Sequence, residues 1–129
     1  MASIVELMQK QPDLCSMEGA SEESIINAEV ALGLSFAADY RQYIAAFGAA
    51  SVVSHELTGI CASKRLNVVD VTLMERAKTA IPSNWYVLEQ PNIDGIVVWQ
   101  SSDSEIFQVN PNGIVYKIAN SLIEYLQFK

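Results

Sequence analysis

The segment LGLSFAADYRQYIAAFGAA, residues 32–50, decides how this chain folds. Its large apolar residues recur at the spacing of one α-helical stripe, and they are Phe36, Tyr40, Tyr43, Ile44 and Phe47. Gly48 follows the last of them, and glycine adopts the left-handed conformation in which many helices end. Because aromatic stripes at helical spacing usually pack rather than bind cofactors, the segment predicts a core helix.

Two further helices are predicted ahead of this segment. The pattern S-x-x-E from Ser3 to Glu6 is a capping box, and it opens a short amphipathic helix that ends before Pro12. Residues 11–20 then read as a loop. A second helix is expected to begin at Ser21 and to stop at Gly33.

The hydrophobic period changes after Gly48. The stretch ASVVSHELTGI, residues 50–60, is rich in β-branched residues and predicts a short strand over residues 52–55 and an extended piece over 57–60. Another S/T-x-x-E pattern, from Thr72 to Glu75, predicts a short helix that stops before Pro82.

The last third of the chain predicts an antiparallel meander. Four β-rich runs, WYVLE, GIVVWQ, EIFQV and IVYKI, alternate with turn-forming residues. A capping box from Ser121 to Glu124 then opens a terminal helix. Helices followed by hairpins indicate the α+β class, and the length of 129 residues fits a single domain, residues 1–129.

Composition restricts the partners. The chain carries 15 acidic and 8 basic side chains, a formal charge of -7, and the basic residues are scattered. This charge repels nucleic acid and attracts a basic protein, although it also serves simply to keep a protein soluble. No apolar run approaches the roughly 18 residues of a membrane span, and the N-terminus lacks a signal-peptide pattern, so we expect a cytoplasmic protein without membrane contact.

Catalytic and metal motifs are not found in the sequence. His55 and Glu56 form an H-E pair, but Gly59 occupies the fourth position after His55, and the chain has no second histidine. Cys15 and Cys61, read as reduced and mostly buried, do not complete a zinc set with one histidine. Phosphate-binding glycine loops are also missing, so neither metal nor cofactor is expected. A hydrolase using His55 and Glu56 stays open as an alternative.

The order of five segments resembles the SUKH superfamily, in particular the SMI/KNR-like branch related to fungal regulators of cell-wall assembly. The likeness covers residues 22–126, and its segments are INAEVALGLSFAADYRQYIAAFGAA, HELTGI, NVVDVTLMERAKTAIPSNWYVLE, NIDGIVVWQSSDSEIFQV and IANSLIEYL. Phe36-Ala37 and Gly48-Ala49 stand where the family commonly has Leu-Pro and Asn-Gly.

The resemblance implies an α+β domain with a mostly antiparallel curved sheet, flanked by N-terminal helices and a C-terminal helix. For bacterial members it implies a non-catalytic immunity protein that binds a toxin, often a nuclease, and blocks it. A scaffold for host signalling or cell-wall enzymes is the alternative, and the chain is expected to be a monomer or a homodimer. Exposed acids and an exposed aromatic residue on the sheet and loops are the predicted partner contacts: Glu56, Asp94, Trp99, Asp103 and Glu105. Packing in the core is the leading interpretation of Trp99, and its predicted contact rests on the alternative of an exposed ring.

Overall fold

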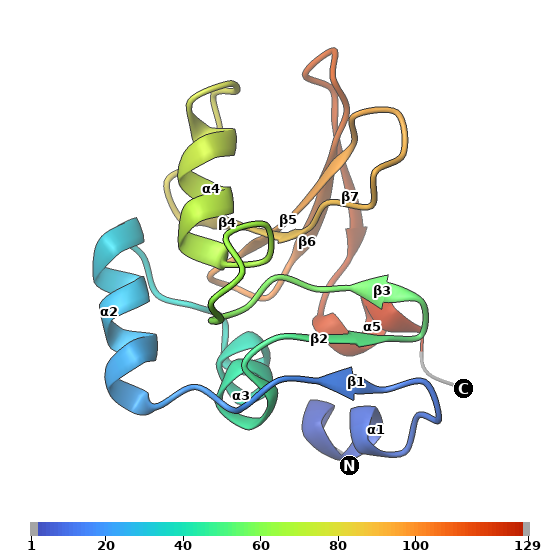
Figure 1. The fold of residues 1–129 in the computed structure, drawn as a ribbon. Coiled ribbons are helices and arrows are strands. Elements are labelled where there is room, and N and C mark those ends of the chain that lie inside the picture. The colour runs from blue at the N-terminus through green and yellow to red at the C-terminus, as the bar shows by residue number, and fades with distance from the viewer. Residues whose placement is uncertain (1–2, 128–129) are drawn as a thin grey trace.

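The computed structural model describes residues 3–127 (Figure 1), and the predicted core helix contributes to the main hydrophobic core. This helix is α3, Ala38–Phe47, and it ends at Gly48, whose φ is 69°. Tyr40, Tyr43 and Ile44 have no exposed surface. The prediction from the aromatic stripe is therefore confirmed, with Phe36 buried just ahead of the helix.

Two helices pack against α3, and both begin where their caps predict. In α1, Ile4–Gln9, the Ser3 hydroxyl accepts a hydrogen bond from the backbone N–H of Glu6 at 3.2 Å. In α2, Glu22–Leu32, the Ser21 hydroxyl caps the first turn, and Gly33 closes the helix in the left-handed conformation. Local capping chemistry thus fixes both helices.

A small antiparallel sheet of order β1-β2-β3 covers the core. Its strands are β1, Cys15–Ser16, β2, Ala50–Val52, and β3, His55–Glu56. The prediction of a plain loop over residues 11–20 is wrong, because β1 pairs with β2 there. Cys15 is exposed and Cys61 half-buried, both as free thiols, so the expectation that both are mostly buried is also wrong.

The predicted strand over residues 52–55 is wrong as well, because the chain reverses direction inside it. Val53 and Ser54 have φ values of 50° and 63° and form the turn between β2 and β3. The Asp13 carboxylate accepts hydrogen bonds from both of their backbone N–H groups, at 3.0 and 3.1 Å. A residue about 40 positions away therefore holds a turn that β-branched Val53 does not favour by itself.

Helix α4, Val68–Arg76, begins earlier than the sequence pattern predicts. Asn67 is its N-cap and accepts from the N–H groups of the first turn. The predicted capping box is wrong, because Thr72 lies inside the helix and its hydroxyl accepts instead from the N–H of Val87 at 3.0 Å. The helix is consequently bonded to the larger sheet through Thr72.

The larger sheet is the predicted meander, with strand order β4-β5-β6-β7. Its elements, with the helix that follows them, are β4, Trp85–Glu89, β5, Val97–Ser101, β6, Ile106–Val109, β7, Val115–Ala119, and α5, Leu122–Leu126. An isolated antiparallel bridge between Leu57 and Glu89 joins the two sheets. The α+β class and the flanking helices are confirmed.

The two faces of the larger sheet contact different cores. Tyr86 and Leu88 belong to the main core around α3, where the Tyr40 and Tyr86 ring centroids lie 4.8 Å apart. Trp85 and Trp99 belong to a second cluster beneath α4. Alternation along the strands thus sends neighbouring residues into separate layers.

Asp39 connects three elements at one point of the fold. Its carboxylate accepts hydrogen bonds from the Gln100 side chain at 3.1 Å, the Ser104 hydroxyl at 3.3 Å and the Leu122 backbone N–H at 2.8 Å. These donors belong to β5, to the turn that follows it and to the start of α5. A single carboxylate therefore positions the C-terminal helix against α3.

Candidate functional site

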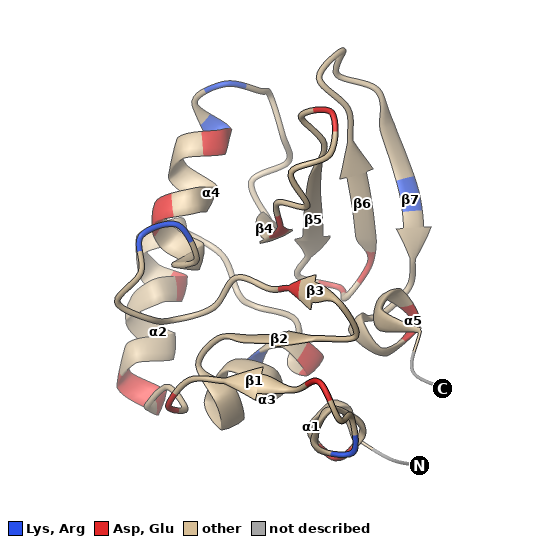
Figure 2. Ribbon diagram, turned by 45° about the vertical axis from the view of Figure 1, so that its right-hand side comes forward, with Lys and Arg blue, Asp and Glu red and all other residues tan. Residues whose placement is uncertain are grey.

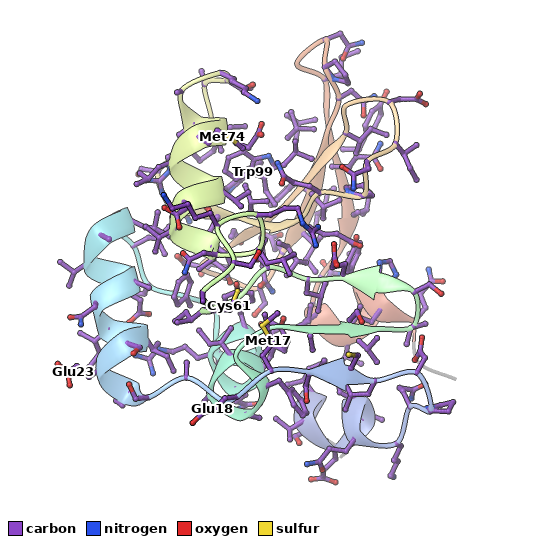
Figure 3. The ribbon with its side chains drawn as sticks, in the orientation of Figure 1. Met17, Glu18, Glu23, Cys61, Met74 and Trp99 are labelled. Atoms are coloured by element: carbon purple, nitrogen blue, oxygen red, sulfur yellow. The ribbon has the colours of Figure 1, made fainter. Side chains whose placement is uncertain are left out.

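A cleft of about 390 Å³ lies between the C-terminal half of α4 and the loops at one end of the larger sheet. Apolar residues form its floor, among them Ile96, Val97 and Val109, and polar residues complete the lining. Figure 3 shows Trp99 between α4 and the strands. Although only 1% of Trp99 is exposed, the residue lines this cleft.

A buried carboxylate lies in the wall of the cleft. Glu75 of α4 is 8% exposed, and its Oε2 accepts from the Gln90 amide at 3.0 Å and from the Lys78 ammonium at 3.5 Å. Within residues 3–127, no hydrogen bond reaches Oε1 of Glu75. The carboxylate therefore has one oxygen available to a ligand.

Two loops in contact make the opposite wall of the cleft. In the β4–β5 loop, Asn92, Asp94 and Gly95 have positive φ, between 51° and 72°. A Cβ built on Gly95 would lie 2.9 Å from the Cγ of Pro111 in the β6–β7 loop. Only glycine allows this approach, so the wall depends on it.

A second group of polar residues surrounds Glu89 at the end of β4. Nδ1 of His55 lies 2.8 Å from Oε1 of Glu89, and the Tyr125 hydroxyl donates to the same oxygen. Oε2 of Glu89 accepts from the backbone N–H of Glu56 at 3.1 Å. Because a carboxylate only accepts, Nδ1 of His55 carries the proton.

This arrangement shifts two pKa values in the cluster. The hydrogen bond to Glu89 raises the pKa of His55, against the opposing effect of burial. Burial first, and then the Glu89 carboxylate, raise the pKa of Tyr125, which keeps its hydroxyl protonated as a donor. The cluster ties β3, β4 and α5 together through one shared carboxylate.

The proposed catalytic pair is not formed. Glu56 binds Arg65 through both carboxylate oxygens, at 2.5 and 3.1 Å, while His55 bonds to Glu89. In the described part of the chain, no Ser, Thr or Cys side chain is hydrogen-bonded to His55. Residues 3–127 also contain no group of three or more His, Cys, Asp or Glu side chains placed to hold a metal ion.

The charges of the surface are uneven because most cations are engaged by the chain itself. Arg41, Arg65, Lys78 and Lys117 form ion pairs with carboxylates, and Arg76 donates to three backbone carbonyls. Exposed acids without an ion pair in the described region include Glu18, Glu23, Asp70, Asp94 and Asp103. Figure 2 shows acidic positions on α2, α4 and the loops of the larger sheet.

A known protein family matches this chain. The family described as SMI1-KNR4 cell-wall, SUKH_5, matches residues 1–128. The chain belongs to the SUKH superfamily. SUKH domains are generally non-enzymatic proteins of the immunity or regulatory type, and this fold is compatible with such a module. No curated protein matches the sequence. No described helix has the length and apolarity to cross a membrane.

The residues predicted as partner contacts lie at separate places on this SUKH domain. Asp94 is exposed beside the cleft, whereas Asp103 and Glu105 lie in the turn at the other end of β5. Glu56 is in the small sheet. The interpretation of Trp99 as a core residue is confirmed, and the alternative of an exposed Trp99 is wrong, because α4 covers the residue. Contact with a partner stays a prediction for all of them.

The sequence patterns did not reveal the residues that form the cleft beside α4 or those that surround Glu89. Glu75 was interpreted as part of a capping box, although burial gives it a different role. Glu89 and Tyr125 are 36 positions apart, and no local pattern joins them. An acid at the end of an otherwise apolar strand, WYVLE, was the only available signal for Glu89.

Proposed function

We propose that this SUKH domain is an immunity protein that binds a toxin domain, such as a nuclease, in the cytoplasm of the cell that makes it and blocks it without turnover. The family supports a binding module of the immunity or regulatory type. The observation that carries the proposal is the charge arrangement. Five of the eight basic side chains are engaged by the chain itself, which leaves exposed acids to set the field.

A basic partner gains from this field in two ways. Nuclease domains that hold phosphates are commonly basic, so an acidic inhibitor is attracted and oriented before contact. Burial of the toxin surface then requires no reactive group. Of the predicted contacts, Asp94 and Asp103 have no ion pair in residues 3–127, whereas Glu56 and Glu105 are bound to Arg65 and Lys117. Neutralising Asp94 or Asp103 is therefore expected to slow association more.

Co-expression tests this function. The toxin reading frame nearest to this gene is induced in a host that carries or lacks the SUKH chain, and growth is measured together with complex formation by gel filtration. We expect restored growth and a stoichiometric complex. Failure of both rescue and complex formation would refute the immunity role.

A regulatory scaffold is the second candidate, and one surface favours it. Strand β7 is an edge strand of the larger sheet, and the large apolar residues in it and just before it are 40–49% exposed: Ile114, Val115, Tyr116 and Ile118. An edge strand with exposed apolar side chains is suited to pairing with a strand of another protein. This role predicts binding that does not depend on the acids and that fails when Tyr116 is replaced by Lys.

A further inference from the structure

The cleft beside α4 contains a buried carboxylate whose bonding capacity is not filled. Glu75 is more than nine-tenths buried, yet only its Oε2 is hydrogen-bonded within the described residues. Among the described residues, the buried side-chain nitrogen or oxygen atom without a hydrogen-bond partner is Nε of Arg76, so Oε1 of Glu75 is not sealed inside the protein. Since Glu75 lines the cleft, Oε1 is available to a donor that enters from outside.

The shape and lining of the cleft favour one kind of donor. Its apolar floor accommodates an aliphatic stem and a flat group. A guanidinium group combines these features with several N–H donors in one plane. An ammonium group presents a strongly hydrated point charge and fits an apolar floor less well.

The ammonium group already near Glu75 is weakly held. Lys78 lies 3.5 Å from Oε2, and its side chain is 61% exposed. A contact of this length from an exposed ammonium group contributes little free energy, so a better placed donor can displace Lys78. Exposed Asp94, on the loop that forms the other wall, keeps the mouth of the cleft attractive to cations.

We propose that this cleft receives an arginine side chain of the protein partner, with the guanidinium group donating to Glu75. The inference rests on the proposed basic partner for its occupant. It deepens that function by naming the anchoring contact, since arginine is among the residues that most often dominate the binding energy of interfaces.

A small probe tests the cleft without the toxin. N-acetyl-L-arginine amide is titrated into the ¹⁵N-labelled chain, and the two tryptophan indole N–H signals are followed by NMR. Trp85 is the internal reference, because it stacks on Phe107 at 4.1 Å and does not line the cleft. We expect a saturable shift of the Trp99 signal and a much smaller shift of the Trp85 signal.

Matched variants and probes assign the effect. Glu75→Gln keeps the shape of the side chain and is expected to weaken binding at least about tenfold, because a charge-assisted hydrogen bond is lost. Glu124→Gln removes an exposed carboxylate on α5 and should leave binding unchanged. Lys78→Ala should strengthen binding, because a competing cation is removed. Near-ultraviolet circular dichroism checks that each variant is folded.

Three results would overturn the inference. They are the lack of a saturable Trp99 shift, equal binding of the neutral analogue N-acetyl-L-citrulline amide, and tighter binding of free L-arginine than of the blocked probe. The last result would assign the cleft to a free amino acid instead of a protein side chain. A negative result with the arginine probe does not change the outcome of the toxin rescue experiment, so the two experiments distinguish failure of this inference from failure of the proposed function.

Discussion

Replacing Asp39 with alanine is expected to destabilise the fold more than its partial exposure suggests. The change removes hydrogen bonds from the Leu122 N–H at 2.8 Å and from the Gln100 amide at 3.1 Å. Gln100 is fully buried, and the Leu122 N–H lies in the first turn of α5. Each bond to a charged acceptor contributes about 1.5 kcal/mol, so the two together give a loss of about 3 kcal/mol.

Urea unfolding followed by tryptophan fluorescence measures this loss of free energy. In a chain of this length, about 3 kcal/mol corresponds to a decrease in Tm of about 10 °C. The control is Asp103→Ala, which removes an exposed carboxylate without a hydrogen-bond partner in residues 3–127, and it should stay within about 0.5 kcal/mol. A loss below about 1 kcal/mol for Asp39→Ala would show that this carboxylate does not hold α5, and the reasoning would be refuted.

Two further predictions concern pH and backbone space. Because the pKa of His55 is raised in the folded state, its bond to Glu89 contributes fully to stability below pH 6.5, and this contribution is lost as the pH rises through the raised pKa. In urea titrations, the stability difference between wild type and His55→Gln should therefore shrink toward alkaline pH. A difference that stays constant with pH would contradict the pairing of His55 with Glu89. Gly59→Ala should prevent stable folding, because the added Cβ would lie 1.9 Å from the Gly48 carbonyl oxygen. The control Gly33→Ala places its Cβ in open space and should lower the free energy of unfolding by only about 1 kcal/mol, measured by thermal unfolding. Equal losses of stability in the two variants would contradict this reasoning.

The sequence predicted those helices and strands whose formation depends on contacts between residues close together in the chain. Ser3, Ser21 and Ser121 cap helices by bonding to N–H groups three residues ahead, and such contacts are visible in sequence. The stripe in α3 and the four β-rich runs were equally direct, because their periods match the burial of their residues. The order of these elements then gave the family.

Elements held by distant contacts were not predicted. The turn at Val53 depends on Asp13, and the role of Thr72 depends on Val87 in a neighbouring strand. The same limitation applies to function, because the exposed or buried state of Trp99 is decided by α4. The cleft and the Glu89 cluster join residues from several elements, so they became visible only in three dimensions.

The central claim is that this SUKH chain inhibits a toxin by binding it, without turnover. Its most direct test is to measure the activity of the purified toxin domain as increasing amounts of the SUKH chain are added. Toxin activity should fall linearly and reach zero at one equivalent, and both chains should be recovered intact by mass spectrometry. Inactivation of many toxin molecules by one SUKH chain, with cleavage or modification of the toxin, would contradict a role without turnover.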